Sequence, residues 1–202
     1  MTGPHYIAFE GAEACGKSTQ AARLAERLDA VLTRETGGTA VGARLREILH
    51  DNDVVHLTPR AEALMTAADR AQHLVEVVVP ALDAGRHVVS DRSLYSTLAY
   101  QGHGRGLPVD ELTDINDWAV DSRWPDLVVF LDTPDEQIAA RMAERDLDRF
   151  EAAGSDFHRR VLDGFRSMAR DAPERWVTID GGGTIDEVES AIVSALTERG
   201  VL

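Results

Sequence analysis

The chain has 202 residues, 44% of them hydrophobic and 28% charged, which is typical of a globular protein with one sizeable core. Its formal net charge of -14 argues against a surface for nucleic acid or anionic membranes, because such surfaces are basic. The single cysteine, Cys15, excludes an internal disulfide framework and fits a reducing compartment. The sequence shows neither a signal-peptide pattern nor an apolar run long enough for a membrane helix, so we expect a cytoplasmic protein.

Short apolar runs alternate along the chain with segments of helical periodicity. We predict strands at 6–9, 30–35, 87–91, 126–132 and 175–180, and helices at 17–28 and 41–50. Further helices are expected after Thr58-Pro59 and Thr133-Pro134, because proline is favoured in the first turn of a helix. Near-continuous apolar strands separated by helices indicate an α/β fold, in which helices cover both faces of a parallel sheet.

No repeat or low-complexity linker divides the sequence, so residues 1–202 are predicted to form one domain. The segment 144–155 is charged and poor in apolar residues, and we predict a mobile loop between two helices there. In open parallel sheets, ligands bind beyond the carboxyl ends of the strands. A glycine-rich segment after the first strand, together with Glu35, Asp91 and Asp132, falls at such ends and indicates the place of a ligand site.

That glycine-rich segment, FEGAEACGKSTQ at 9–20, contains the complete pattern of a phosphate-binding loop, Gly11-x-x-x-x-Gly16-Lys17-Ser18. Glycines let backbone N–H groups converge on phosphate oxygens, and the following helix N-terminus adds partial positive charge. Lys17 supplies a charge for the outer phosphates, and Ser18 offers Mg²⁺ a hydroxyl ligand. A chance match is the alternative, but the predicted strand before the loop and helix after it favour a nucleoside-triphosphate site.

Cys15 lies inside this loop. One interpretation is a catalytic thiol, because helix N-termini lower the pKa of thiols. The other is a small side chain that the loop tolerates, which we favour because no histidine is nearby in sequence.

Four further motifs follow in order: TRETGGT at 33–39, ADRAQH at 68–73, SDRSLYSTLAYQG at 90–102 and RMAERDLDRFE at 141–151. With the loop, this ordered set resembles the thymidylate kinase family over nearly the whole chain. It is most similar to the bacterial class that carries its catalytic arginine in a lid, since the loop here contains no arginine. The resemblance implies a three-layer P-loop fold with a five-stranded parallel sheet, a lid at about 141–154, Mg²⁺-ATP as donor, dTMP as acceptor and a homodimer.

The resemblance also implies roles for residues of matching type. ATP binding would involve Gly11, Ala12, Glu13, Ala14, Cys15, Gly16, Lys17, Ser18, Thr19 and Arg141. Substrate binding would involve Glu13, Glu35, Thr66, Arg70, Arg92, Ser96, Thr97 and Tyr100. Catalysis is implied for Lys17, Glu13, Arg92, Arg145 and Arg149, and metal binding for Ser18 and Asp91. In this scheme Glu13 faces the sugar 3′-hydroxyl, Arg92 the acceptor phosphate and Arg70 a base carbonyl.

The lid arginines Arg141, Arg145 and Arg149 are spaced by four, so on a continuing helix they would share one face. A closing lid would bring them to the transferring phosphate and exclude water. Taken alone, the same spacing among acidic residues is typical of a solvated, salt-bridged face. The ordered set of motifs favours the lid.

Four positions depart from the family pattern. Thr36 replaces the usual proline of EPGGT, Ala14 a common glycine, and Ser93 a frequent aromatic residue. At the position four residues before Arg70, where an aromatic residue stacks on thymine, this chain has Thr66. Loss of that stacking would cost on the order of 1 kcal/mol of base affinity. Met65 could partly substitute, the base could differ from thymine, or the pocket could be built from elsewhere.

We therefore predict an ATP-dependent nucleoside monophosphate kinase that converts dTMP to dTDP, without nucleic-acid or membrane partners. One alternative is a kinase for another pyrimidine (deoxy)nucleotide or for a deoxynucleoside. A second alternative is a nucleotide-binding regulator without catalysis, against which the complete set of Lys17, Asp91, Arg92 and lid arginines argues.

Overall fold

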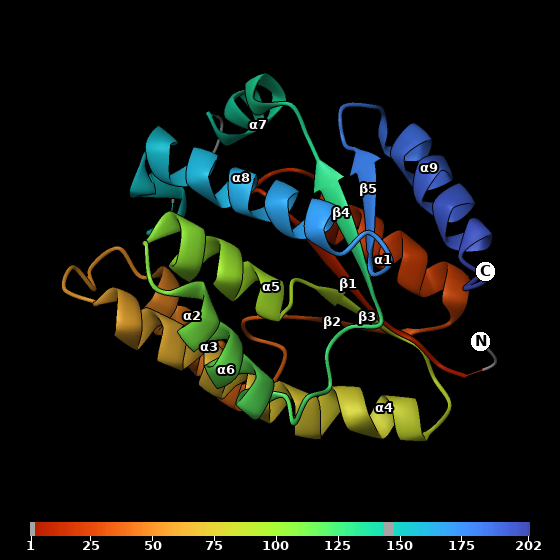
Figure 1. The fold of residues 1–202 in the computed structure, drawn as a ribbon, viewed down its shortest axis with the longest axis horizontal. Coiled ribbons are helices and arrows are strands. Elements are labelled where there is room, and N and C mark those ends of the chain that lie inside the picture. The colour runs from red at the N-terminus through yellow and green to blue at the C-terminus, as the bar shows by residue number, and fades with distance from the viewer. Residues whose placement is uncertain (1–2, 144–147) are drawn as a thin grey trace.

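The computed structural model describes residues 3–143 and 148–202. Five parallel strands form one sheet in the order β2-β3-β1-β4-β5. The strands are β1 (Tyr6–Gly11), β2 (Val31–Arg34), β3 (Val88–Asp91), β4 (Leu127–Asp132) and β5 (Trp176–Asp180). This arrangement confirms the predicted five-stranded parallel sheet and places each predicted strand within about a residue or two of its expected bounds (Figure 1).

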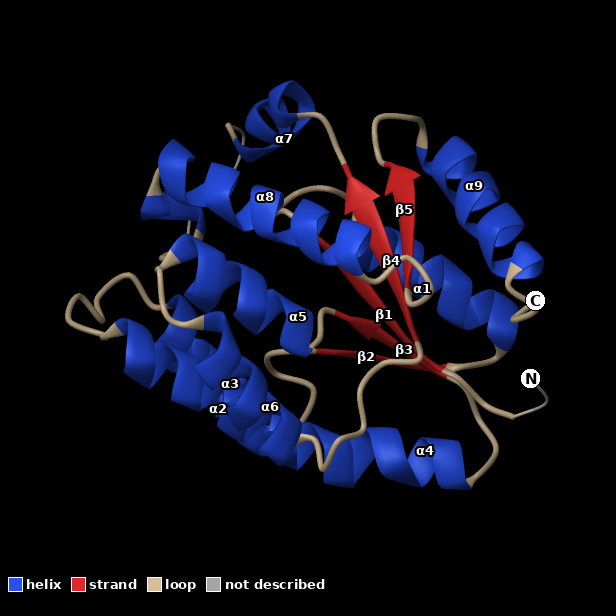
Figure 2. Cartoon of the chain, viewed as in Figure 1, coloured by secondary structure: helices blue, strands red, loops and turns tan. Residues whose placement is uncertain are grey.

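Helices cover both faces of the sheet, as the continuous apolar strands require (Figure 2). On one face, α1 (Lys17–Leu28) and α9 (Ile185–Glu198) pack Ala21, Leu24 and Ile192 against the strand residues Phe9 and Val129. On the other face, Phe130 and Val88 belong to a core shared with six further helices. These are α2 (Ala40–His50), α3 (Pro59–His73), α4 (Val79–Asp83), α5 (Leu94–Thr97), α6 (Val109–Ala119) and α8 (Ser155–Asp171). The helix α7 (Asp135–Met142) has no buried residue and lies outside this core.

Two π-helical turns interrupt the helices, η1 (Leu74–Val78) between α3 and α4, and η2 (Leu98–Gly104) after α5. The proline signals are confirmed as helix starts: α3 begins at Pro59, where Thr58 Oγ1 accepts the Ala61 N–H at 3.3 Å, and α7 begins just after Pro134. Within the described ranges 3–143 and 148–202, no helix combines the length and apolar character needed to cross a membrane.

The predicted loop between two helices lies between α7 and α8. Its described part, 148–154, contains the short 3₁₀ helix η3 (Glu151–Ala153), and the side chains of Phe150 and Glu151 are buried. This part is therefore packed against the body of the protein. The carboxyl ends of β1, β2 and β3 are adjacent, because Phe9 pairs with Asp91 and Asp91 with Arg34. The fold thus brings the glycine loop, Glu35 and Asp91 to one edge.

Candidate active site

The glycine loop connects β1 directly to α1, which is the context that its sequence pattern requires. Gly16 has φ 98°, a left-handed conformation that favours glycine. A Cβ on Gly11 would lie 2.9 Å from the Leu131 carbonyl oxygen, so this position has no room for a side chain. The buried Lys17 turns back over the loop and donates to the Ala12 carbonyl oxygen at 2.8 Å. The loop therefore curves around a pocket that Lys17 helps to line.

Asp91, at the end of β3, faces the first turn of α1. The Ser18 hydroxyl donates to Asp91 Oδ2, while Oδ1 is buried and has no hydrogen-bond partner among the described residues. The described residues contain no group of three or more His, Cys, Asp or Glu side chains that could hold a metal by themselves. Mg²⁺ usually keeps several waters and takes one or two carboxylates plus substrate phosphates. The Ser18–Asp91 pair fits that kind of site.

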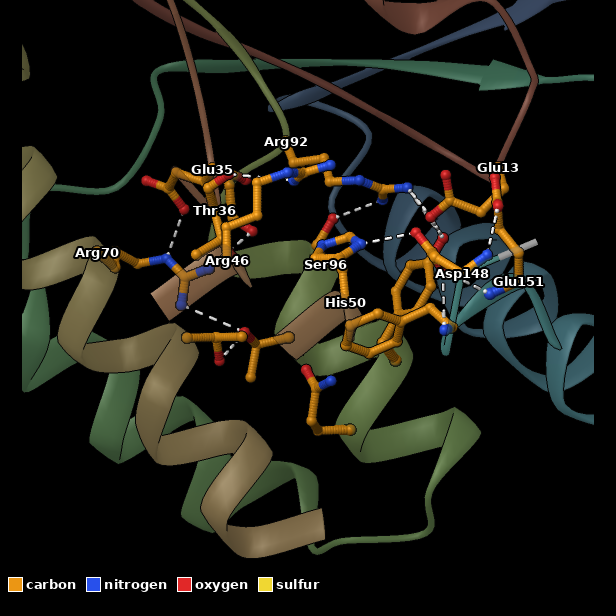
Figure 3. Close-up of a pocket in the computed structure, with 16 residues that line it drawn as sticks. Glu13, Glu35, Thr36, Arg46, His50, Arg70, Arg92, Ser96, Asp148 and Glu151 are labelled. Carbon is orange, nitrogen blue, oxygen red and sulfur yellow. Dashed lines mark hydrogen bonds and ion pairs between the residues drawn. The ribbon is translucent and has the colours of Figure 1, made fainter. Parts of the chain in front are cut away.

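Arg92 follows Asp91 and adopts φ 74°, with its N–H bonded to the Phe9 carbonyl at 2.9 Å. Its guanidinium donates to Glu13, to Ser96 Oγ at 3.0 Å and to the Tyr100 hydroxyl at 3.1 Å. Burial alone would raise the pKa of Glu13, but the positive charges of Arg92 and Lys17 lower it to about 2. Glu13 is therefore ionised and neutralises Arg92 in this structure (Figure 3).

The turn that carries Arg92 is held by Glu10, which sequence reasoning did not single out. Its fully buried carboxylate accepts from the Ser93 N–H at 2.8 Å, the Ser93 hydroxyl at 2.7 Å and the Ser96 hydroxyl at 2.6 Å. Burial raises the pKa of Glu10, and Arg92 opposes that rise. The sequence did contain a signal for Glu10, namely an acidic residue inside an otherwise apolar strand. Such a residue needs buried hydrogen-bond partners.

Arg70, on α3, is 3% exposed and has several polar partners. Its Nε donates to Glu35 Oε2 at 2.7 Å, and Glu35 Oε1 lies 3.0 Å from His73 Nδ1. Burial would raise the pKa of Glu35, but Arg70 and His73 lower it to about 2. His73 in turn contacts Thr33 Oγ1 through Nε2 at 2.7 Å. Figure 3 shows Arg70 and Glu35 at the end of the site opposite Glu13.

Two pockets meet at these residues. The pocket that we call the inner pocket extends from Glu13 to Arg70, and all eight predicted substrate-binding residues line it: Glu13, Glu35, Thr66, Arg70, Arg92, Ser96, Thr97 and Tyr100 (Figure 3). The second, which we call the loop pocket, is lined by Lys17, Ser18, Thr19, Asp91 and Arg141 among others. The two share Glu13, Glu35, Arg46 and Arg92, so their contents would be neighbours.

Arg46 on α2 is a site residue that the sequence did not reveal. It lines both pockets and donates to the Thr36 carbonyl oxygen at 3.1 Å. Burial, Arg34 and Arg92 together lower its pKa. Arg34 also lines the loop pocket, so three guanidinium groups gather where the pockets meet. Nothing in its local sequence distinguishes Arg46 from other helical arginines, and only the packing of α2 places it here.

The lid arginines do not form one group. Arg141 donates to the Ala14 carbonyl at 3.0 Å and lines the loop pocket. Arg149 instead donates to the buried carboxylate of Glu62 at 2.7 Å and to the Leu49 carbonyl at 2.8 Å. The predicted role of Arg145 falls outside the described residues. Because α7 ends at Met142, Arg141 and Arg149 do not share a helix face.

The departures from the family pattern have local explanations. The turn with Thr36 is held by Arg46 and by Asp69, whose Oδ1 accepts the Gly37 N–H at 3.0 Å. Ala14 adopts φ 56°, the conformation in which glycine is common. The Ser93 hydroxyl caps α5 by accepting the Tyr95 N–H at 3.4 Å. Thr66 lies in the inner pocket, 8% exposed, and bonds to Thr97.

A phosphate-binding loop beside an arginine-rich second pocket defines a P-loop phosphotransferase with a small anionic acceptor. The sequence model of the thymidylate kinase family matches residues 9–192. The thymidylate kinases of Geotalea uraniireducens (strain Rf4) and Synechococcus sp. (strain JA-3-3Ab) are 42% and 46% identical to this chain, covering 96% of it and 97% and 96% of their own lengths. The crystal structure of thymidylate kinase from Ehrlichia chaffeensis has 30% identity and a TM-score of 0.80, covering 96% of this chain and 99% of its own. This chain belongs to the thymidylate kinase family.

Proposed function

We infer that this protein transfers the γ-phosphate of ATP to dTMP and releases ADP and dTDP. The observation that carries the inference is the junction of the two pockets at Glu13, Glu35, Arg46 and Arg92. Phosphoryl transfer depends chiefly on positioning and on neutralising charge, because the transition state spreads negative charge over several oxygens. A donor in the loop pocket and an acceptor in the inner pocket would meet at this junction.

On the donor side, Lys17 and the loop amides bind the polyphosphate, and Arg141 lies beside them. Ser18 and Asp91 would hold Mg²⁺, consistent with the buried Asp91 Oδ1 that lacks a protein partner among the described residues. When bound, the ion would help to neutralise the negative charge of the phosphates. Activity should therefore require the metal.

On the acceptor side, Arg92 and Arg46 bind the monophosphate, since guanidinium groups pair with two phosphate oxygens at once. Glu13 and Tyr100 lie next to Arg92 and would face the sugar. Arg70, at the far end of the inner pocket, would meet the base. Residues 141–154 act as the lid within a single domain, and Arg149 anchors the end of that lid to α3 through Glu62.

The expected homodimer has a suitable surface. Exposed apolar side chains occur on α3 and on the elements α2, η1 and α6 that contact it, namely Val41, Ile48, Leu64, Val75 and Trp118. Trp118 is 85% exposed. Apolar patches of this kind on a globular protein mark association surfaces. We propose that a second copy of the chain covers them. The cytoplasmic location stays a prediction.

The test is a panel of nucleosides and nucleoside monophosphates assayed with Mg²⁺-ATP, with ADP release as the readout. We expect dTMP to give the highest kcat/KM. A deoxynucleoside or another pyrimidine nucleotide as best acceptor would contradict the proposal. Other pyrimidine nucleotides are included because this chain has Thr66 at the position of the stacking aromatic residue. Tight ATP binding without transfer to any acceptor would identify a regulator instead.

A further inference from the structure

We propose that Thr66 is a specificity-determining residue, because it directs the hydroxyl proton of Thr97 so that Thr97 and Arg70 together accept only a base with a carbonyl next to a ring N–H. The proposal rests on the proposed function in one respect, that a nucleotide base occupies the inner pocket. It gives a role to the position where this chain departs from the stacking aromatic residue of its family.

Protein partners use most of the hydrogens on the Arg70 guanidinium. A guanidinium carries five N–H donors and no acceptor. Among the described residues, Nε donates to Glu35, Nη1 to Thr97 at 3.2 Å and to Asn116 Oδ1, and Nη2 to the Ser93 carbonyl at 3.1 Å. Four donors are therefore used, and one hydrogen on Nη2 remains. Because Arg70 lines the inner pocket, that hydrogen can bind a base acceptor.

Asn116 helps to fix the orientation of the Arg70 guanidinium. It is fully buried on α6, and its side-chain amide donates to the Leu112 carbonyl at 2.7 Å, which turns Oδ1 toward Arg70. Glu35 holds the other side of the guanidinium. Arg70 is thus clamped from two elements and cannot rotate to present a different set of hydrogens without leaving a buried partner unpaired.

Thr66 and Thr97 each have a single hydroxyl hydrogen to donate. Thr66 Oγ1 donates to the Ala63 carbonyl at 2.8 Å, so its hydrogen is used. Thr66 Oγ1 and Thr97 Oγ1 lie 3.1 Å apart, and the hydrogen between them must therefore belong to Thr97. One lone pair of Thr97 accepts from Arg70, and the other remains. Toward the pocket, Thr97 can only accept.

On these two neighbouring groups, the inner pocket consequently presents one donor, on Arg70, and one acceptor, on Thr97. Gln101 also lines the pocket, and its Nε2 donates to Glu62 Oε1 at 2.7 Å. The edge of thymine or uracil has a carbonyl beside a ring N–H and matches this pair. The corresponding edge of cytosine has an amino group beside an unprotonated ring nitrogen, which reverses both roles. Thr97 and Arg70 are 1% and 3% exposed, so water could not easily repair either mismatch.

The experiment compares dTMP with 5-methyl-dCMP, which keeps the methyl group and changes only this edge. Dissociation constants from calorimetry and kcat/KM are measured for the wild type, Thr66→Val, Thr66→Ala and Thr66→Ser. Thr197→Val on α9 is the control, because Thr197, like Thr66, donates to a backbone carbonyl of its own helix, here that of Val193 at 2.7 Å, and it does not line the pocket.

We expect the wild type to bind dTMP roughly 100-fold more tightly than 5-methyl-dCMP, since a buried donor and acceptor would both be mispaired. Valine or alanine at position 66 frees the Thr97 hydroxyl, so the ratio should fall about tenfold. Serine restores the hydroxyl and should restore the ratio. The control should leave it unchanged.

A wild-type ratio below about tenfold, an unchanged ratio in both Thr66→Val and Thr66→Ala, or a serine variant that behaves like valine would each overturn the proposal. Binding is measured independently of turnover. A wild type that binds dTMP selectively but transfers no phosphate would therefore refute the proposed function and leave the role of Thr66 supported.

Discussion

The carboxyl group of Asp69 gives a sharp test of the electrostatics beneath the site. Asp69 is fully buried on α3; its Oδ1 accepts the Gly37 N–H, and its Oδ2 has no partner among the described residues. Burial, with the nearby charge of Glu35, raises its pKa from 3.8 to about 6. The folded state therefore holds the proton of Asp69 more tightly than the unfolded chain does.

The sign and size of the effect follow by linkage. Because the folded state binds more protons, this group makes the free energy of unfolding decrease as pH rises from about 4 through about 6. At about 1.4 kcal/mol per pH unit, a rise from 3.8 to about 6 corresponds to about 3 kcal/mol. Asn resembles the protonated form and keeps the acceptor for Gly37, so Asp69→Asn should lack this pH dependence.

The assay is urea denaturation of wild type and Asp69→Asn at several pH values between about 4 and about 8. The difference between the two unfolding free energies should shift in favour of the variant by about 3 kcal/mol across that range. Asp83→Asn, which removes an exposed carboxylate at the end of α4, controls for the loss of one negative charge. Parallel curves for wild type and Asp69→Asn would refute the reasoning.

Four further substitutions test the site and the surface. Lys17→Met should lower kcat by at least about 10³-fold in an ADP-release assay with little change in thermal unfolding, and near-normal turnover would remove Lys17 from the mechanism. Arg92→Ala should raise the KM for dTMP on the order of 100-fold, because charge-assisted bonds to the phosphate are lost; an unchanged KM would contradict that role. Glu10→Gln should raise the same KM about tenfold through the turn it holds, whereas an effect on stability alone would make Glu10 merely structural. Trp118→Asp should yield a monomer in light scattering, and a dimer of unaltered mass would place the association surface elsewhere.

Short sequence patterns predicted those strands, loops and site residues whose structure depends on neighbouring residues in the sequence. Val128 to Leu131 read as a buried strand because they are continuously apolar, and they form the fully buried centre of β4. The glycine loop was visible because its backbone shape needs glycine at Gly11 and Gly16. Its neighbours Asp91 and Glu35 could be placed because the ends of parallel strands share an edge.

What the sequence did not reveal depends on packing between distant elements. The strand order follows from how the connecting helices pack, which no local pattern specifies. Arg46 and Asn116 look like ordinary helical polar residues until α2 and α6 place them beside the site. The continuing helix considered for the lid was wrong because α7 stops at Met142, and Arg149 then finds the buried Glu62, a partner 87 residues away in sequence.

The ion pair between Arg92 and Glu13 lets these two charged groups satisfy one another within the protein. In the proposed function, a phosphate that binds Arg92 would compete with the carboxylate of Glu13, and this exchange would release Glu13 to meet the sugar hydroxyl. Recognition of the phosphate and preparation for the sugar would then be a single event.

An unphosphorylated nucleoside brings no anion to replace Glu13 at Arg92. Thymidine should therefore bind with the ion pair between Glu13 and Arg92 intact, and it should react poorly even when its base fills the pocket. Faster turnover of thymidine than of dTMP would show that this exchange does not operate.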